Sequence, residues 1–386
     1  MQNERREKVR KIEAQHKAML ENRLKVNILT LSVGYQLVKL ADRHDSPLME
    51  NIRRIRVNIA EQYGFVIPKI CIKVNPYMDF PTNGYELLLK GVKIGSGSVE
   101  VDKFLMLHTE GKVIKDFKGI PTKDPVSNSD ALWIDAKDRD KAILRGDCIV
   151  VDAPSVMITH IGELIKHYMG EIITHQDVKD RIDSLQDDFP IIVEEILEVP
   201  LGAIHQILKN LLCDKIPTKD IITILETIIK VAPRIKYSEI ELLDSISRIA
   251  PKATYNEIAI LDSVRSALAM TITDTFKSDD GNIKFFTLPA ESESYLLQKL
   301  QDNQYGHNFI LTTAESTALI QALNEVVQKS REMRIEPILI VDTSIRYALD
   351  RFAKNNDIAL NVLGTAEISA NAKIEHLGEI WLRFEV

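Results

Sequence analysis

One stretch of this chain, residues 146–226, changes from a mixed α/β pattern to a purely helical pattern. It opens with a short apolar strand at 148–151. The segment 155–173 that follows carries apolar residues at three- and four-residue spacing, which is typical of a helix that buries one face. Further helical segments are expected at 176–196 and 201–214. The helix at 155–173 is therefore expected to join an α/β region to an all-helical region.

A length of 386 residues is too great for a single hydrophobic core and indicates about two to four domains. The net charge of −7 argues against a nucleic-acid partner, which selects for a basic face. Cys71, Cys148 and Cys213 lie far apart, so neither a disulfide framework nor a thiolate zinc site is expected. No apolar run approaches the roughly 18 residues that cross a bilayer, and no signal peptide follows Met1, so the chain as given is expected to be soluble.

The N-terminal part predicts a linker followed by two small α/β subdomains. Residues 1–28 mix charges of both signs around a thin apolar seam, which fits a solvated linker or an arm that docks on something else. The next stretch has a β-α-β-β pattern, with a helix at 47–64 and a tight reversal at Gly95-Ser96-Gly97. The first subdomain is expected to comprise 29–102 and 152–171, interrupted by an inserted second subdomain at 103–151.

The rest of the chain predicts a helical third subdomain at 172–270 and a C-terminal α/β subdomain at 271–386. Short connections around residues 171 and 271 suggest that the C-terminal subdomain swings relative to the first two. The predicted fold class is α+β multidomain. In the last subdomain, strands are expected at 283–287, 337–341, 358–363 and 380–384, and helices at 291–301, 314–333 and 344–354.

The helical region contains an internal repeat. The residues Ala232-Pro233, Tyr237, Glu239-Ile240 and Leu243-Asp244-Ser245 recur 18 residues later, as Ala250-Pro251, Tyr255, Glu257-Ile258 and Leu261-Asp262-Ser263. Because proline lacks an amide donor and clashes with the preceding turn, each copy is expected to form its own turn and short helix.

Catalytic and metal-binding patterns are missing from the sequence. His160, His167 and His175 lie seven and eight residues apart, whereas a helix chelates metal through residues four apart. There is no Gly-x-Ser-x-Gly nucleophile elbow. Gly91, Gly95 and Gly97 do not form a phosphate-binding loop, because no helix follows them and no Gly-Lys-Ser/Thr motif is present. No enzymatic activity, cofactor or metal is therefore expected.

Several segments resemble the cytoplasmic part of the flagellar and type III secretion export gate family, the FlhA-like or FHIPEP family. They cover residues 30–270 in the right order and spacing, whereas the C-terminal subdomain matches only in layout. The segments include Val33-Gly34-Tyr35, Gly64-Phe65-x-x-Pro68, Ile94-Gly95-Ser96-Gly97, Asp124-Pro125, Trp133-Ile134, Val156-x-x-Thr159-His160, Leu208-x-Asn210-Leu211-Leu212, Pro217-x-x-Asp220 and Ile224-Leu225-Glu226.

This resemblance implies the same four subdomains and a non-enzymatic role in protein export. Residues 1–28 would link to membrane-spanning N-terminal helices absent from this chain, which places the protein at the cytoplasmic face of the bacterial inner membrane. The family forms a homo-oligomeric ring under the secretion channel. It docks export chaperone-substrate complexes and works with other export apparatus proteins.

The resemblance also implies a docking site in an apolar dimple between the first two subdomains. Asp124, Pro125 and Thr159 stand at positions that match the family motif there. Ser127 stands where the family commonly has phenylalanine, which removes about 1.5–3 kcal/mol of apolar contact. Either another residue lines the dimple or its affinity differs. Partner binding is thus expected in a groove flanked by Asp124 and Thr159, with Pro125 and Ser127 taking part.

Other functions remain open from the sequence. A virulence secretion export gate is the close alternative to a flagellar one. The short helices of the third subdomain also fit a winged-helix-like nucleic-acid binder, and the inserted subdomain could form the cleft of an enzyme. The acidic balance and the missing catalytic residues argue against these last two.

Overall fold

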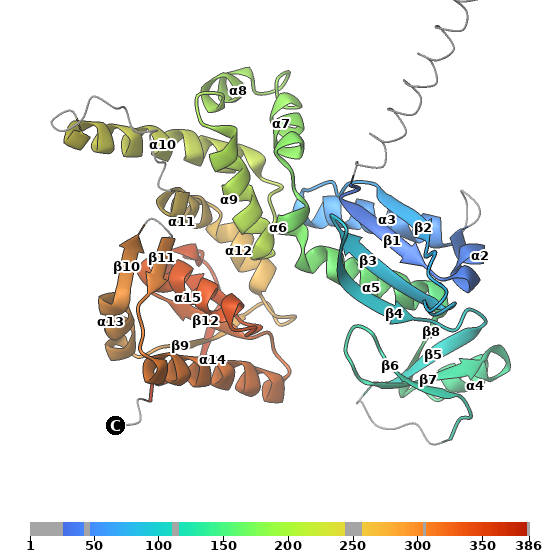
Figure 1. Ribbon diagram of the computed structural model, residues 1–386. Coiled ribbons are helices and arrows are strands. Elements are labelled where there is room, and N and C mark those ends of the chain that lie inside the picture. Colours follow the sequence, from blue (N-terminus) through green and yellow to red (C-terminus); the bar gives the residue numbers. More distant parts are fainter. Residues whose placement is uncertain (1–25, 42–46, 110–115, 244–256, 304–305, 384–386) are drawn as a thin grey trace, which may run out of the picture. The chain divides into compact units, whose positions relative to one another are not determined.

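The structure is a computed structural model that describes residues 26–41, 47–109, 116–243, 257–303 and 306–383. The chain divides into two compact units, residues 1–172 and 173–386 (Figure 1). Sheets and helices occur in both units, so the predicted α+β class is confirmed. Within the described ranges, no helix combines the length and the apolar character needed to cross a membrane.

The first unit begins with a four-stranded sheet of order β2-β1-β3-β4. Strand β1 (Leu29–Val33) is buried at every residue and lies between β2 (Ile70–Val74), to which it is parallel, and β3 (Gly84–Leu89). This central position explains why even Thr30 and Ser32, which alternate with the apolar residues of the strand, are buried. The helix η1 (Tyr35–Leu37), the short α2 (Val38–Ala41) and the longer α3 (Pro47–Tyr63) follow β1.

The prediction of a tight reversal at Gly95-Ser96-Gly97 is wrong. These residues lie inside β4 (Val92–Ser98), and the chain reverses at Lys90 and Gly91, whose φ angles are 50° and 86°. Gly95 and Gly97 serve packing instead, since a Cβ at Gly95 would lie 2.3 Å from Leu164 Cδ1 and one at Gly97 would lie 2.6 Å from the Tyr85 hydroxyl.

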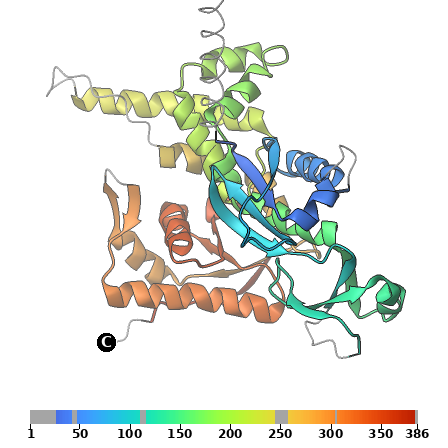
Figure 2. The same cartoon turned by 45° about the vertical axis from the view of Figure 1, so that its right-hand side comes forward.

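The second sheet of this unit is antiparallel and has the order β6-β7-β5-β8 (Figure 1 and Figure 2). It contains β5 (Lys103–His108), β6 (Ile120–Lys123), β7 (Asp130–Asp135) and β8 (Cys148–Asp152). Between β7 and β8, η2 (Ala136–Asp138) leads into α4 (Arg139–Leu144). The buried side chains of Met106, Leu132, Ile134 and Ala142 pack together. The short strand β6 was not predicted, because three of its four residues are exposed and its sequence carries little apolar pattern.

Helix α5 (Ala153–His167) returns from the second sheet to the first part of the unit. It contacts α3 and β4, and Ile55 of α3 approaches the backbone of Gly162. The single helix expected at 155–173 is wrong, because the backbone leaves helical values at Tyr168 and α6 (Met169–Ile172) begins after it. Met169 and Ile172 are also buried, so the apolar spacing continues through the break and does not reveal it.

The second unit begins with α7 (His175–Asp183), α8 (Pro190–Ile196) and α9 (Leu201–Cys213). A single helix at 176–196 was expected and is wrong. Proline disfavours helical geometry in the residue before it, and Phe189 accordingly has φ −135° and ψ 57°, so a new helix starts at Pro190.

The repeat was expected to produce a helix boundary at Pro233, and this is also wrong. Helix α10 (Ile221–Leu243) continues through Pro233. The proline removes one hydrogen bond to the carbonyl of Ile229, while α10 is anchored by its buried N-terminal half from Ile221 to Ala232. Pro251 and Tyr255 of the second copy lie outside the described residues, which resume at α11 (Glu257–Ala267).

The boundary expected between residues 270 and 271 falls inside α12 (Ala269–Phe276). Residues 173–386 form one compact unit, and the swing expected of the C-terminal subdomain relative to the first two stays a prediction. The C-terminal part of this unit has a fully parallel sheet of order β13-β12-β9-β14. Its strands are β9 (Ile283–Thr287), β12 (Ile338–Val341), β13 (Asn361–Gly364) and β14 (Ile374–Glu379).

Helices α13 (Ala290–Lys299), α14 (Thr313–Met333) and α15 (Thr343–Asn355), the hairpin β10 (Leu300–Asn303) and β11 (Gly306–Phe309), and η3 (Thr365–Glu367) complete this part. Phe286 and Leu339 pack with buried side chains of α14 and α15. The last strand was expected at 380–384 but lies at 374–379. Most of β14 is exposed, so its sequence lacks an apolar pattern. The apolar residues that follow it led to the prediction at 380–384.

Candidate partner-docking surface

Asp124 organises the turn between β6 and β7. Its Oδ2 accepts hydrogen bonds from the Ser127 amide and the Ser127 hydroxyl, both at 2.7 Å. The Asp124 carbonyl accepts from the Asn128 amide at 2.9 Å, and Asn128 has a φ of 56°. Aspartate commonly closes such turns, and asparagine tolerates the left-handed conformation. The hydroxyl of Ser127 is therefore used inside the turn, while Pro125 is half-buried beside it.

Thr159 lies on the exposed side of α5. The helix is capped by Asp152, whose Oδ1 accepts from the Ser155 amide at 2.7 Å. Met157 and Ile161 are buried on the opposite side of the helix. The Thr159 hydroxyl donates back to the Ser155 carbonyl at 2.8 Å, which leaves its oxygen and methyl group facing solvent.

The residue after Thr159 connects α5 to the Asp124 turn. His160 is buried and its Nδ1 lies 2.8 Å from the Tyr85 hydroxyl. Burial raises the pKa of Tyr85, and the charge of Asp124 raises it further. Burial lowers the pKa of His160, and Asp124 opposes that shift. The charge of Asp124 therefore acts on both members of the Tyr85–His160 pair. That partners bind here, in a groove flanked by Asp124 and Thr159, stays a prediction.

Exposed apolar side chains that the sequence reasoning did not single out lie in the Asp124 turn and on the second sheet. Side chains alternate along a strand, and the register puts Ile120 beside Trp133 and Ile149 beside Leu107 on one face of the second sheet. Trp133 is buried, whereas Ile120 and Ile149 are 45% and 54% exposed, and Val126 in the turn is 44% exposed. These three residues, Ile120, Val126 and Ile149, are named the apolar rim.

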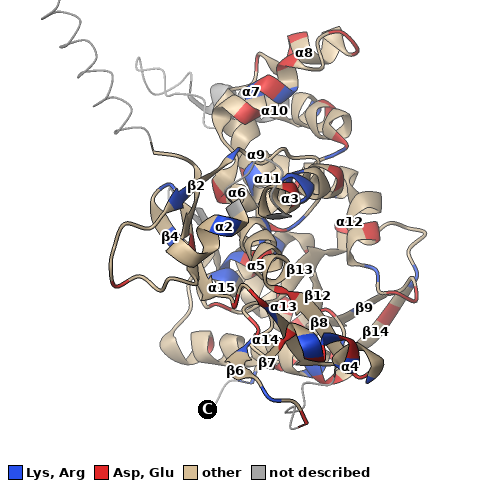
Figure 3. Ribbon diagram, turned by 90° about the vertical axis from the view of Figure 1, so that its right-hand side faces the viewer, with Lys and Arg blue, Asp and Glu red and all other residues tan. Residues whose placement is uncertain are grey.

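A second exposed apolar surface lies on the α8 segment in the other unit. Phe189, Ile191 and Leu197 are 41%, 69% and 66% exposed. Between Ile182 and Leu208 six side chains are acidic and none is a lysine or arginine. Acidic residues of α8 itself are red in Figure 3. We call Phe189, Ile191 and Leu197 the α8 patch. An apolar surface with a rim of single-signed charge is typical of a protein contact.

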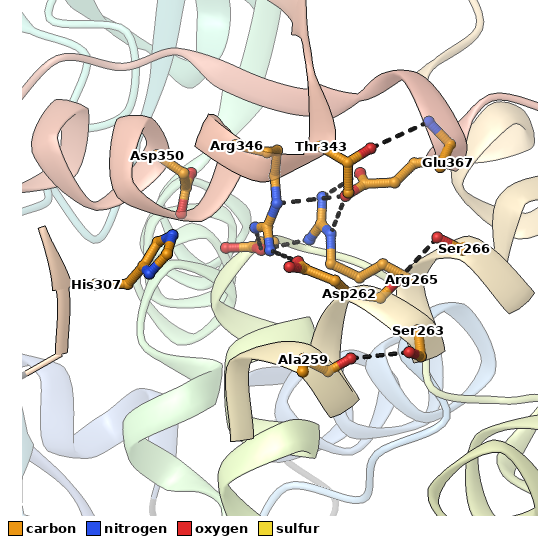
Figure 4. Close-up of polar contacts among 12 residues, drawn as sticks. Ala259, Asp262, Ser263, Arg265, Ser266, His307, Thr343, Arg346, Asp350 and Glu367 are labelled. Carbon is orange, nitrogen blue, oxygen red and sulfur yellow. Dashed lines mark hydrogen bonds and ion pairs between the residues drawn. The ribbon is translucent and has the colours of Figure 1, made fainter. Parts of the chain in front are cut away.

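The second unit also contains a buried charge cluster, shown in Figure 4. Arg265 of α11 and Arg346 of α15 are 1% and 0% exposed, and Glu367 of η3 is fully buried. Arg265 Nε lies 2.7 Å from Glu367 Oε1, and Arg346 Nη2 lies 2.7 Å from Asp262 Oδ1. Asp214, at the end of α9, contacts both arginines and Lys354.

The charges of this cluster compensate one another. Burial alone would lower the pKa of Arg265, but Glu367 and Asp214 outweigh it and leave the pKa raised. Burial alone would raise the pKa of Asp214, but Lys354 and the two arginines leave it lowered. The cluster links α9, α11, α15 and η3, so its role is to stabilise the second unit.

Comparison with known proteins gives a consistent picture. A family model described as "FHIPEP family" matches residues 1–373. A curated relative from Helicobacter pylori, "Flagellar biosynthesis protein FlhA", is 40% identical over 375 residues, which are 97% of this chain and 48% of the relative. The chain thus spans about half the length of the curated relatives that it matches.

Two solved structures share the fold at low sequence identity. "Structure of the Chlamydia pneumoniae CdsV protein" has a TM-score of 0.74 at 17% identity, covering 93% of this chain and 98% of that one. "Cryo-EM structure of nonameric EPEC SctV-C" has a TM-score of 0.68 at 17% identity, covering 92% of this chain and 99% of that one. Similarity at this level concerns the fold.

Proposed function

The chain belongs to the FHIPEP family, and from this premise we propose that it is the cytoplasmic part of a flagellar type III protein export gate. The choice of a flagellar system is supported by the 40% identity to a flagellar relative over nearly the whole chain. The matches to secretion proteins such as CdsV are at 17% identity, so a virulence system is the alternative. The proposed location is the cytoplasmic face of the bacterial inner membrane.

Within the gate, the proposed role is to dock export chaperone-substrate complexes without catalysis. The observation that carries this proposal is the surface formed by the Asp124 turn and the apolar rim. The carboxylate of Asp124 accepts two hydrogen bonds that hold the turn, Val126 is exposed in it, and Ile120 and Ile149 are exposed on the same sheet. A partner helix could lay its apolar face on the rim and direct polar groups to Asp124 and Thr159.

The proposed assembly is a ring of identical subunits, together with other export apparatus proteins. Its support is the fold shared with a protein that was solved as a nonamer and the exposed α8 patch, which offers apolar surface for a subunit contact. A ring requires a heterologous contact, in which two different surfaces of each subunit meet.

The experiment that tests this function is native mass spectrometry of the chain with and without a flagellar export chaperone-substrate complex. The proposal expects a new species of chain plus complex, and no such species with a DNA duplex. A complex with DNA alone would favour the nucleic-acid alternative.

A further inference from the structure

The C-terminal part of the second unit holds a cavity of about 580 Å³. Its walls come from β9, β12, the start of α13 and the connection from η3 to β14. Most of its lining is apolar, with Phe285, Leu288, Ile340, Ile368 and Ile374 as the larger side chains. Of the described residues that line it, only Glu293 is charged.

The cavity lies where the sheet topology favours a ligand site. The chain runs from β9 to β12 and β13 on one side, then returns to the other side of β9 as β14. In parallel sheets, a crevice opens at the carboxyl ends of the strands where the strand order changes from one side to the other, and ligands bind there. Thr287 and Leu288, at the end of β9 and just after it, line one part of the cavity, which also extends along the sheet to Ile374 at the start of β14.

Glu293 is held in place but keeps an oxygen free for a ligand. It lies in the first turn of α13, and its Oε1 accepts a hydrogen bond of 3.0 Å from the amide of Asp342, at the start of α15. Among the residues that the structure describes, none donates a hydrogen bond to its Oε2 and no cation pairs with it. Burial raises the pKa of Glu293, as expected for a carboxylate that lacks a compensating charge.

We propose that this cavity binds a lysine or arginine side chain of a partner polypeptide, with apolar residues on either side of that cation. The cationic head pairs with Oε2 of Glu293, and its aliphatic stem lies against the apolar walls. A volume of about 580 Å³ is within the range of small-ligand sites. It holds a few side chains, so the occupant is a short extended segment. This site is separate from the docking surface in the first unit and does not depend on the proposed function.

The test uses the full chain with 13C-labelled isoleucine methyl groups. The peptide acetyl-Ile-Lys-Ile-amide is titrated while the methyl resonances of Ile340, Ile368 and Ile374 are followed by NMR. These three resonances are expected to shift together. The peptide acetyl-Ile-Gln-Ile-amide, which lacks the cation, is expected to bind about tenfold more weakly because it loses a charge-assisted hydrogen bond.

Matched variants separate the role of the carboxylate from that of the fold. Glu293→Gln keeps an acceptor for the Asp342 amide, and it is expected to remove the preference for the lysine peptide. Glu291→Gln removes a charge from the same turn outside the cavity and should leave the preference unchanged. Ala290→Leu fills the rim of the cavity and should weaken both peptides.

Three results would overturn the proposal. One is the absence of shifts at millimolar peptide. Another is equal affinity for the lysine and glutamine peptides in the unmodified chain. The last is an unchanged lysine preference in Glu293→Gln. Methyl shifts confined to isoleucines outside the cavity count as the first of these results.

Discussion

Arg265 and Glu367 form a bidentate ion pair across 102 residues of sequence, with Nε to Oε1 at 2.7 Å and Nη2 to Oε2 at 2.6 Å. Both side chains are essentially inaccessible to solvent. The pair connects α11, in the helical part of the second unit, to η3, in its C-terminal part. This explains why residues 173–386 behave as one compact unit, despite the change from helical to α/β sequence pattern near residue 270.

Removing one member of this pair should destabilise the second unit strongly. Glu367→Leu leaves Arg265 buried without its main partner, and breaking a buried pair in this way typically costs about 3–5 kcal/mol. The double variant Arg265→Met/Glu367→Leu should recover part of the loss. Urea unfolding followed by circular dichroism measures both. The exposed pair Glu163–Lys166 provides the control, since Lys166→Gln should cost about 1 kcal/mol or less. A Glu367→Leu effect no larger than this control would contradict the account.

Glu315 should titrate at unusually low pH. Lys299, Tyr295 and the Thr312 amide all donate to its carboxylate and lower its pKa to about 2 from an ordinary value of 4.5. Because the folded pKa is the lower one, this carboxylate stabilises the fold fully above pH 4.5, and the stabilisation is lost as the pH falls towards 2.

NMR titration of the Glu315 carboxyl carbon measures this pKa directly. Lys299→Met should raise it more than Tyr295→Phe does, because Lys299 is the largest cause of the shift. A titration near 4.5 in the unmodified chain, or no change in Lys299→Met, would show that this network does not form.

Gly34 should not tolerate a side chain. A Cβ there would lie 2.3 Å from the Pro81 carbonyl oxygen and 2.4 Å from that of Thr82. Backbone atoms cannot move aside as a flexible side chain can. Gly34→Ala should therefore destabilise the first unit by about 1–3 kcal/mol or more. Gly162→Ala provides the matched control, because its Cβ would meet Ile55 at an ordinary 3.4 Å and alanine favours a helix. Thermal unfolding of both variants checks this, and equal melting temperatures would refute it.

Much of the fold could be predicted from the sequence, where local pattern and burial agree. Strand β12 is buried at every residue and reads as an unbroken apolar run, and β1 shows apolar residues that alternate with Thr30 and Ser32. The pattern was misleading at β14, which is mostly exposed, and at Tyr168, where burial continues through a helix break. At Pro233 the local rule predicted a boundary, but α10 continues through it.

The sites were less predictable, because they depend on contacts between distant residues. Asp124 and Thr159 were found only through a family resemblance, and the apolar rim depends on strand register across β6, β7, β5 and β8. Arg265, Arg346 and Glu367 look like ordinary surface charges in sequence. Only the fold reveals that they are buried together.

The α8 patch should contribute to self-association. Ile191→Lys places a charge on a side chain that is 69% exposed, so the fold should be little affected, whereas an apolar subunit contact would be lost. Analytical ultracentrifugation should show a shift towards monomer. Met270→Lys, at an exposed apolar position on α12, should leave the distribution unchanged. If Ile191→Lys shows the same distribution of monomer and oligomer as Met270→Lys, the α8 patch is not part of the ring contact.

The central claim, that the Asp124 turn and the apolar rim dock an export chaperone-substrate complex, is tested most directly by calorimetric titration of that complex into three variants. Ile149→Asp should weaken binding about tenfold or more, because one buried apolar side chain contributes about 1.5–3 kcal/mol. Ser127→Phe should strengthen it by adding an aromatic contact beside the rim. Val66→Asp, on an exposed apolar residue outside the second sheet, should match the unmodified chain. Unchanged affinity in both Ile149→Asp and Ser127→Phe, with the fold intact, would contradict the claim.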